Sequence, residues 1–299
     1  MAEVVVIGGT GTLGRAIVNT LNKNNKDTTI LILSRDEQKQ AVMRREYGPN
    51  VSFALGDVTR EDSLDPYLRG ASVVFHVAAL KHVDIVEENV HQAMLTNYFG
   101  VVNAYRACDR AGVKHLVFSS TDKAVDPINA YGFSKAAAEK FLFSANAQSR
   151  SHKLRASVYR WGNVIGSTGS VIPYFVKTLI EEKTAYITDL GMTRYWIPIE
   201  WAVNYMLFTY KNAKEDTAMI PTNMKCAPVV DVIGAIADIL DISGHKVTVT
   251  GIRAGEKLHE TMISEHAEYC PDDSRSDEKY TRDELISLLT PIVNREAKR

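Results

Sequence analysis

The residues whose types and spacing most clearly suggest chemistry are a tyrosine and a lysine four positions apart, Tyr131 and Lys135. In a helix this spacing puts the phenol and the ammonium group on one face. A nearby cation stabilises the phenolate, so we expect the pKa of Tyr131 to fall toward the range that a general base needs. The same spacing also occurs by chance on amphipathic surface helices, so the pair gains weight only from its surroundings.

A second candidate lies just before that pair, in the stretch Ser119–Ala124, where Asp122 and Lys123 are adjacent. Adjacent opposite charges bias each other's pKa, so one group can donate a proton while the other accepts one. Taken alone, the two side chains are equally well interpreted as a solvated ion pair on a loop. They become candidates for acid–base roles if the fold brings them to the site of the tyrosine.

A glycine-rich turn near the N-terminus predicts a phosphate-binding site. The apolar run Val4–Ile7 leads into Gly8–Gly14, which has the spacing G-x-x-G-x-x-G, and a helical pattern follows. Glycines let the backbone approach a pyrophosphate closely, and the helix start presents N–H groups to it. An ordinary left-handed turn is the alternative, but the strand before and the helix after argue against it. The predicted dinucleotide contacts here are Gly8, Thr10, Gly11, Thr12, Leu13 and Gly14.

The residues after the second expected strand bear on the choice between NADP and NAD. Ser34 and Arg35 come first, with Lys39 one turn further on. A basic residue at this point accommodates a 2′-phosphate, whereas an acidic residue favours the free ribose of NAD. We therefore expect NADP; NAD is the alternative if Asp36 binds the ribose and Arg35 is a solvated surface residue. After the third strand, Asp57 is placed either to accept from the adenine amine or to cap the next helix.

Strand and helix patterns alternate along the first half of the chain, which predicts a parallel sheet with helices on both faces. Ligands in such sheets bind beyond the carboxyl ends of the strands. The expected fold is α/β, a Rossmann-type doubly wound parallel sheet with a smaller C-terminal substrate-binding lobe. The expected strands are Val4–Ile7, Thr29–Leu33, Val51–Ala54, Val73–His76, His115–Ser119 and Ala156–Tyr159, and the expected helices between them are Leu13–Lys23, Glu37–Tyr47, Glu61–Leu68, Asn89–Ala111 and Tyr131–Asn146.

This regular alternation ends near Asn163, so we expect residues 1–163 to bind the dinucleotide and residues 164–299 to form the substrate lobe. The two parts are expected to form one compact unit without a linker. Gly166–Gly169 and the polar stretch Cys270–Lys279 are expected to be loops. Helices are expected at 196–213, which returns to the dinucleotide-binding part, at Val229–Leu240 and at Thr281–Leu289, with a short strand at Lys246–Thr250.

The composition is that of an ordinary globular protein and argues against several function classes. The 299 residues include 35 basic and 36 acidic side chains, so there is no basic excess for nucleic acid or an anionic membrane. Three scattered cysteines, Cys108, Cys226 and Cys270, suit a reducing compartment and form no zinc-binding pattern. We find no signal peptide and no apolar run of membrane-spanning length, so we expect a cytoplasmic protein without a metal.

Beyond these local patterns, the chain resembles the extended short-chain dehydrogenases/reductases that act on nucleotide sugars. Within that group it is most similar to the inverting UDP-N-acetylglucosamine 4,6-dehydratases of bacterial polysaccharide and flagellin-sugar biosynthesis. Ala254 and Trp161 depart from the family pattern, in which proline and tyrosine are common. The segments that carry the resemblance are Ala78–Val83, Ser120–Ala124, Pro127–Gly132, Arg160–Ser167, Ile187–Asp189, Met192–Trp196 and Gly251–Glu260.

The resemblance implies a lyase reaction that proceeds through a temporary oxidation. Oxidising C4 of the sugar makes the C5 proton acidic, water is lost across C5–C6, and the hydride returns to C6. Tyr131, activated by Lys135 and assisted by Thr121, would take the C4 hydroxyl proton. Lys123 would remove the C5 proton and Asp122 would protonate the departing hydroxyl. Reprotonation from the opposite face would give UDP-2-acetamido-2,6-dideoxy-β-L-arabino-hexos-4-ulose.

Further binding residues are expected around this centre. Arginine forks match diphosphate oxygens, which favours Arg194 and Arg253, and Glu256 is placed to accept from a ribose hydroxyl, although each could be a surface salt bridge instead. The full expected cofactor site also includes Ser34, Arg35, Lys39, Asp57, Val58, Ala78, Ala79, Lys81, Asn97, Tyr131 and Lys135. The substrate site includes Lys81, Asn163, Ser167, Val171, Thr188, Arg194, Arg253 and Glu256.

Two other functions remain open on the sequence alone. A nucleotide-sugar 4-epimerase, or a bifunctional dehydratase/epimerase, needs Tyr131 and Lys135 but has no use for a base at C5. A non-enzymatic NADP sensor is more remote, because this chain keeps the tyrosine–lysine pair. Besides the substrate UDP-N-acetylglucosamine, the expected partner is a second copy of the chain. Fold analogy makes helices Asn89–Ala111 and Tyr131–Asn146 the pairing face of such a homo-oligomer.

Overall fold

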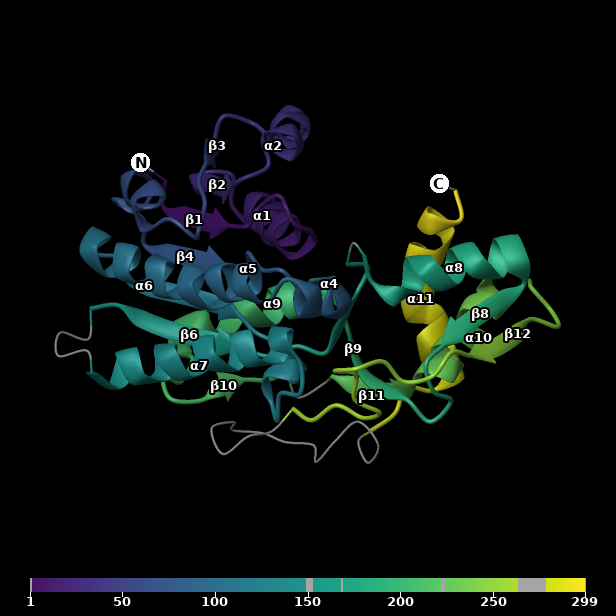
Figure 1. Cartoon of the computed structure of the whole chain (residues 1–299). Helices are drawn as coiled ribbons and strands as arrows, with labels where there is room; N and C mark the ends of the chain where they lie inside the picture. Colours follow the sequence, from purple (N-terminus) through teal and green to yellow (C-terminus); the bar gives the residue numbers. More distant parts are fainter. Residues whose placement is uncertain (1, 149–152, 168, 222–223, 263–277, 299) are drawn as a thin grey trace.

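A seven-stranded parallel sheet forms the centre of the larger part of the molecule (Figure 1). The computed structural model describes residues 2–148, 153–167, 169–221, 224–262 and 278–298. The strand order is β10-β6-β5-β4-β1-β2-β3, so the direction of sheet growth reverses between β1 and β4, the switch point where such sheets bind ligands. The strands are β1 (Val4–Ile7), β2 (Ile30–Ser34), β3 (Val51–Leu55), β4 (Val73–His76), β5 (His115–Ser119), β6 (Arg155–Tyr159) and β10 (Ala218–Met219).

Alternating side chains on the strands explain why helices cover both faces of this sheet. In β1, Val4 and Val6 point into one core, closed by α1 and α9. Val5 and Ile7 point into the opposite core, closed by α3, α6 and α7. The helices of this part are α1 (Thr12–Asn24), α2 (Glu37–Met43), α3 (Asp65–Leu68), α4 (Val83–Glu88), α5 (Val90–Met94), α6 (Gly100–Ala111), α7 (Ala130–Gln148) and α9 (Ile199–Thr209).

A smaller lobe lies beside this sheet and has a core of its own (Figure 1). In it β9 pairs with β7 and β11, and β8 pairs with β12. Helices α8, α10 and α11 contact one another and bury their apolar sides together. The elements are β7 (Asn163–Ile165), α8 (Val171–Glu182), β8 (Thr184–Ile187), β9 (Thr193–Pro198), β11 (Lys225–Pro228), α10 (Val229–Ile239), β12 (Lys246–Val249) and α11 (Arg282–Glu296).

Strand β9 joins the two parts because its two faces belong to different cores. Tyr195 and Ile197 are buried in the core between the large sheet and α9, whereas Trp196 is buried in the core of the smaller lobe. The chain also returns to the larger part after β7, as α9 against α1 and as β10 beside β6. No helix in the described part of the chain is both long enough and apolar enough to cross a membrane.

The expected strands are confirmed, with ends that agree within one residue. Two expected helices are interrupted: Glu61–Leu68 consists of a 3-10 turn followed by α3, and Asn89–Ala111 contains a π-helical turn at Leu95–Phe99. The helix expected at Glu37–Tyr47 ends at Met43 and continues as a 3-10 turn. The short strand β10 was not predicted, because two residues carry too little periodicity to be recognised.

In the smaller lobe, the helix expected at 196–213 is wrong at its start. Residues 196–198 belong to β9, and α9 begins only at Ile199. A strand buried on both faces has no polar alternation, so its apolar run resembled the start of a buried helix. The last helix continues past Leu289 to Glu296, because Val293 is also buried in the lobe's core. Most of Cys270–Lys279, including Cys270, and Thr168 of the loop Gly166–Gly169 lie outside the described residues.

A buried ion pair ties the sheet to α7 and to the C-terminal segment. Arg160, directly after β6, contacts Glu139 of α7 through Nε at 3.0 Å and Nη2 at 2.5 Å. Both side chains are 3% exposed. Nη1 of Arg160 donates to the main-chain oxygen of Met262 at 3.1 Å, and the Ser120 hydroxyl donates to Glu139. Removing either partner would leave an uncompensated charge in the interior, which is strongly destabilising.

We expect Arg160→Met to lower the free energy of unfolding by about 3–5 kcal/mol, because the Glu139 carboxylate would then be buried without its cation. Arg60→Met is the matched control, since Arg60 and Asp62 form an ion pair whose side chains are 70% and 72% exposed. Its loss is expected to be below about 1 kcal/mol. Urea unfolding followed by circular dichroism measures both, and equal losses would contradict the interpretation.

Candidate active site

The site begins with a short turn beyond the carboxyl end of β5. Asp122–Ala124 form a 3-10 turn that Thr121 caps, because its hydroxyl accepts a hydrogen bond from the Lys123 N–H at 3.4 Å. The same hydroxyl donates to Oδ1 of Asp122 at 2.9 Å. Asp122 is fully buried, and its Oδ2 has no hydrogen-bond partner among the described residues. This turn therefore holds a buried carboxylate, one oxygen of which makes no hydrogen bond within the described part of the chain.

Helix α7 lies directly against that turn. A Cβ atom on Gly132 would overlap the main-chain oxygen of Lys123, so only glycine permits this approach. Asn129, just before the helix, accepts a hydrogen bond from the Gly132 N–H at 2.7 Å. The first turn of α7 is thereby fixed, and with it the buried side chains of Tyr131 and Lys135.

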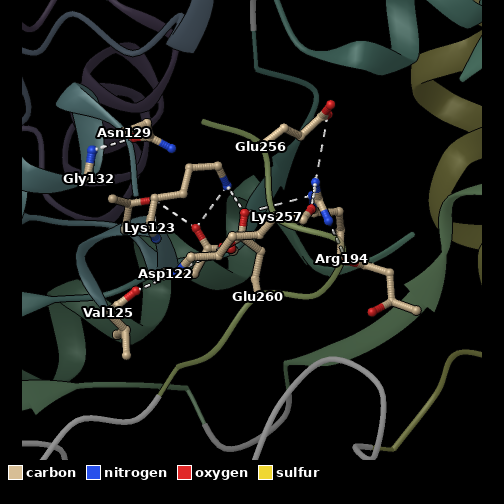
Figure 2. Close-up of polar contacts among 12 residues, drawn as sticks. Asp122, Lys123, Val125, Asn129, Gly132, Arg194, Glu256, Lys257 and Glu260 are labelled. Atoms are coloured by element: carbon tan, nitrogen blue, oxygen red, sulfur yellow. Dashed lines mark hydrogen bonds and ion pairs between the residues drawn. The ribbon is translucent and has the colours of Figure 1, made fainter. Parts of the chain in front are cut away.

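The ammonium group of Lys123 lies between two carboxylates (Figure 2). Its Nζ is 3.1 Å from Oδ1 of Asp122 and 3.2 Å from Oε1 of Glu260. Burial disfavours the charged amine, but these two carboxylates outweigh it and raise the pKa of Lys123 above its usual value. The side chain keeps 19% of its exposure, so Lys123 is less completely buried than the two carboxylates.

The tyrosine–lysine pair differs electrostatically from the sequence prediction. Burial raises the pKa of Tyr131 to about 12, and the charge that opposes this rise is that of Lys123. Burial also lowers the pKa of Lys135 to about 7, against the opposing effect of Glu139. The expectation that Lys135 lowers the pKa of Tyr131 is therefore wrong for the protein alone. Nζ of Lys135 donates instead to the main-chain oxygen of Ser119 at 2.6 Å.

A loop from the smaller lobe, Gly251–Glu260, closes the other side of the site (Figure 2). Nδ2 of Asn129 donates to the main-chain oxygen of Gly255 at 2.8 Å, and Nζ of Lys257 donates to that of Val125 at 2.6 Å. Both bonds join this 251–260 loop to the segment between β5 and α7. The turn Asp122–Ala124, called the catalytic turn below for the role that we propose for it, and the smaller lobe are thus held in one rigid arrangement.

Arg194 of β9 anchors the same loop from within. Its Nη1 donates to the main-chain oxygens of Thr193 at 2.7 Å and Leu258 at 3.0 Å, and its Nη2 donates to that of Lys257 at 2.8 Å. The side chain is only 8% exposed and lies 3.9 Å from Glu256 and from Glu260. Because its guanidinium group is already bonded to main-chain oxygens, these contacts favour a role for Arg194 in holding the loop over the expected role in binding a diphosphate.

A pocket of about 300 Å³ opens on the smaller lobe next to the start of this loop. Two of the predicted substrate residues, Thr188 and Arg253, line it. Glu256 accepts from the Arg253 N–H at 3.3 Å, which links the pocket to the loop interior. The lining residues that the sequence analysis missed are Tyr174, Tyr186, Thr250 and Gly251.

The glycine turn fits a dinucleotide phosphate. Gly8 has a φ of +85°, and a Cβ on it would lie 2.6 Å from the backbone nitrogen of Ala78. A Cβ on Gly14 would lie 2.5 Å from the main-chain oxygen of Gly8. No side chain in the described part of the chain caps the start of α1, whose N-cap is Gly11. The tight turn and the uncapped helix start together form the cradle that a pyrophosphate requires.

The residues predicted to decide between NADP and NAD lie at the end of β2 and in the segment that leads into α2. Asp36 caps α2 by accepting from the Lys39 N–H at 2.9 Å and also pairs with the Lys39 ammonium group. This acid is therefore engaged within its own helix. The Ser34 hydroxyl accepts from Gln40, and the half-exposed Arg35 lies 3.8 Å from Asp57.

Other predicted cofactor residues have structural contacts. Asn97, in the π-helical turn, is fully buried; it accepts from the Leu80 N–H at 2.8 Å and donates to the Leu80 oxygen at 2.9 Å and to Ser134 at 3.0 Å. It holds the Ala78–Leu80 loop in place after β4. The Val58 side chain is buried in the sheet core, and Asp57 accepts from the Thr59 N–H as a local turn.

The remaining predicted residues lie on several separate segments of the chain. Lys81 is exposed after β4, and Asn163 begins β7. Ser167 lies in the loop before α8, which begins at Val171. The most important residue that the analysis missed is Glu260, although it closes one of the segments used for the resemblance. Only the fold shows that it reaches Lys123, because the two lie far apart in the sequence.

The chain is similar in sequence and in structure to known proteins over most of its length. Over 264 residues the chain is 39% identical to the UDP-N-acetylglucosamine 4,6-dehydratase (inverting) of Campylobacter jejuni, a match that covers 88% of this chain and 77% of the relative. It is 35% identical over 265 residues to the UDP-glucose 4-epimerase of Rickettsia bellii, covering 87% and 77%. Among solved structures, Pen from Bacillus thuringiensis superposes with a TM-score of 0.88 at 28% identity, covering 97% of each chain.

A sequence family described as polysaccharide biosynthesis protein matches residues 4–280, nearly the whole chain. Because this match and the relatives above span both parts of the molecule, the likeness includes the glycine turn, the catalytic turn and the 251–260 loop. The protein therefore belongs to the polysaccharide biosynthesis protein family, as the resemblance in its sequence implied.

Proposed function

We propose that this protein is an inverting UDP-N-acetylglucosamine 4,6-dehydratase, a lyase on a dehydrogenase scaffold. The observation that carries the proposal is the buried ion pair of Asp122 and Lys123, which acts electrostatically on Tyr131. A 4-epimerase needs a base for one hydroxyl group. Loss of water across C5–C6 needs in addition a base for the C5 proton and an acid for the C6 hydroxyl. The similarity to the Campylobacter jejuni enzyme supports the same choice.

We further propose NADP as the cofactor. The Gly8–Gly14 turn and the start of α1 would hold the pyrophosphate, and Arg35 with Ser34 would hold the 2′-phosphate, since Asp36 is engaged with Lys39. Bound there, the nicotinamide supplies a hydride acceptor for C4 and returns the hydride to C6. Because the cofactor ends as it began, no external oxidant is needed.

The Asp122–Lys123 pair shares one proton that can sit on either group. In the resting pair the proton is on Lys123, 3.1 Å from Asp122. Its transfer to Asp122 gives a neutral amine and a carboxylic acid, the C5 base and the C6 acid that elimination needs. Burial works in this direction, because it disfavours separated charges, but in the resting site the two carboxylates outweigh it and keep the proton on Lys123. When Lys123 has taken the C5 proton and Asp122 has given its proton to the leaving hydroxyl, the resting pair is restored.

The substrate's nucleotide half is assigned to the pocket of the smaller lobe. Tyr174 and Tyr186 offer rings for a planar base, and Arg253 offers a cation for a phosphate oxygen. The 251–260 loop leads from this pocket to Glu260 beside Lys123. A nucleotide bound at one end of the loop would therefore direct its sugar toward the catalytic turn.

The decisive experiment is incubation with UDP-N-acetylglucosamine in D2O, followed by mass spectrometry and NMR of the product. We expect loss of water and one deuterium at C5. Lys123→Met should reduce the rate by about 10²- to 10⁴-fold, the usual contribution of a positioned acid or base. Lys114→Met is the control, because this exposed lysine lies at the amino end of β5, whereas the site lies beyond its carboxyl end.

A second candidate function is nucleotide-sugar 4-epimerisation, which the similarity to the Rickettsia bellii enzyme supports. The same experiment separates the two functions. An epimerase would give a product of unchanged mass with the galacto configuration and would not incorporate deuterium at C5. That outcome, with Lys123→Met as active as the native chain, would overturn the dehydratase proposal.

Cofactor choice is tested by titrating NADP and NAD calorimetrically into protein freed of bound nucleotide. We expect Arg35→Ala to weaken NADP binding about 10- to 100-fold, the loss of one charge-assisted phosphate contact, and to change NAD binding little. Arg60→Ala, which removes another exposed arginine, should change neither. Equal weakening of both nucleotides would contradict a 2′-phosphate contact at Arg35.

The close contact between α7 and the catalytic turn makes a further prediction. Gly132→Ala should lower kcat about 10- to 100-fold, because the new methyl group would displace Lys123 from its position. Stability should fall as well, because the methyl group would overlap a main-chain oxygen unless α7 and the turn move apart, so kcat is measured at a temperature where the variant is folded. Gly48→Ala is the control, because its nearest neighbour lies at 3.5 Å. Full activity of Gly132→Ala would show that the turn tolerates movement.

A further inference from the structure

Glu260 is a buried acid of the site to which the proposed chemistry assigns no step. It is 2% exposed, and its Oε1 lies 3.2 Å from Nζ of Lys123, which Asp122 also contacts (Figure 2). One carboxylate would be enough to pair with the lysine. A second, drawn from a different part of the fold, indicates a specific role for the position and charge of this amine.

The two carboxylates that contact Lys123 come from different parts of the fold. Asp122 is its neighbour in the turn after β5, whereas Glu260 is carried by the 251–260 loop of the smaller lobe. That loop is fixed by Arg194 and by Lys257, whose Nζ bonds the main-chain oxygen of Val125. Its other end, at Gly251 and Arg253, lines the pocket.

The charges around Lys123 explain how Glu260 can be buried there. Asp122 faces the amine from its own turn, Tyr131 from α7 and Arg194 from β9. From the 251–260 loop, Glu260 approaches the amine directly, and Lys257 lies 4.0 Å from Oε2 of Glu260. Glu256 lies behind Arg194 at 3.9 Å. Three cations therefore lie within 4.0 Å of the Glu260 carboxylate, which compensates its loss of solvent.

We propose that Glu260 is a positioning residue for Lys123, which holds the ammonium group against Asp122 and links its placement to the loop that lines the pocket. Without Glu260, Asp122 would be the only carboxylate that holds the amine. The long side chain of Lys123 could then adopt other rotamers. An opposite charge at such a distance shifts the pKa of its partner by about 1–3 units. The reaction that Lys123 serves rests on the proposed function. The contact between Glu260 and Lys123 does not depend on it.

The first test measures the reactivity of Lys123 directly and needs no substrate. Trace acetylation with isotope-labelled acetic anhydride, read by peptide mass spectrometry across a pH series, reports the midpoint at which the amine becomes nucleophilic. In Glu260→Gln we expect this midpoint to fall by about one unit or more, because one of the two stabilising charges is lost. Glu260→Asp keeps the charge on a shorter chain and should fall between this variant and the native protein.

The control is Glu215→Gln, which removes an acid paired with Arg155 at the opposite edge of the sheet. Its labelling curve for Lys123 should coincide with that of the native chain. Thermal melting checks that each variant is folded. If neither Glu260→Gln nor Glu260→Asp moves the curve, the positioning role is overturned, whatever happens to activity.

The second test is the pH dependence of turnover with UDP-N-acetylglucosamine. The reactive pair needs its shared proton, so kcat must decline once Lys123 loses it at high pH. We expect Glu260→Gln to lower kcat about tenfold, to leave KM within about threefold, and to shift the alkaline limb of kcat to lower pH by the shift seen in labelling. A role in loop folding alone would lower kcat without moving that limb and would overturn the proposal. If the native protein does not turn over this sugar at all, the proposed function fails, and the labelling experiment still decides the role of Glu260.

Discussion

The ammonium group of Lys123, buried between the carboxylates of Asp122 and Glu260, is the interaction on which the rest of the site depends. A charge removed from water is tolerated only when partners surround it closely, because the attraction must replace the lost hydration. Here the partners come from two parts of the fold, so the two parts must be held in fixed relation. Arg194 and Asn129 supply this constraint: the first binds the main chain of the 251–260 loop from β9, and the second joins that loop to the start of α7.

Close backbone packing turns this requirement into a rigid arrangement. Gly132 allows α7 to touch the catalytic turn, and Gly162 lies so near Tyr195 of β9 that any side chain would collide with it. Strand β9 then places one face in each core, and Arg160 binds α7 and the main chain at Met262 through one buried guanidinium group. Such contacts are either made in full or lost, because packed interiors deform little. The position of a few polar atoms at the site is thus set by the packing of the whole molecule.

The sequence predicted the features that depend on residues close together in the chain. The glycine turn, the six strands that lead to the site and the tyrosine–lysine helix each depend on spacing within a few residues, and all were recognisable. Glu260 and the pocket tyrosines Tyr174 and Tyr186 were missed, because their importance comes from neighbours distant in the chain. The pKa of Tyr131 was misjudged for the same reason: spacing indicated Lys135 as its cation, but burial and Lys123 determine it. Burial is a property of the complete fold, and no local pattern contains it.

On this scaffold a dehydratase differs from an epimerase in the protons that it must transfer, because both reactions need the same hydride transfer from C4. Both reactions need the oxidation at C4, and the glycine turn with Tyr131 and Lys135 serves either. Burying a lysine and two carboxylates does not by itself favour folding, since apolar side chains of similar size would serve the core as well or better. A buried lysine whose pKa is shifted by neighbouring charges is typical of sites that act on a substrate. A site that only moved a hydride would have no use for an acid and a base beside the tyrosine. The charge cluster is therefore the part of the structure that argues most directly for elimination, and the proton that Asp122 and Lys123 share returns to its starting place when water has left.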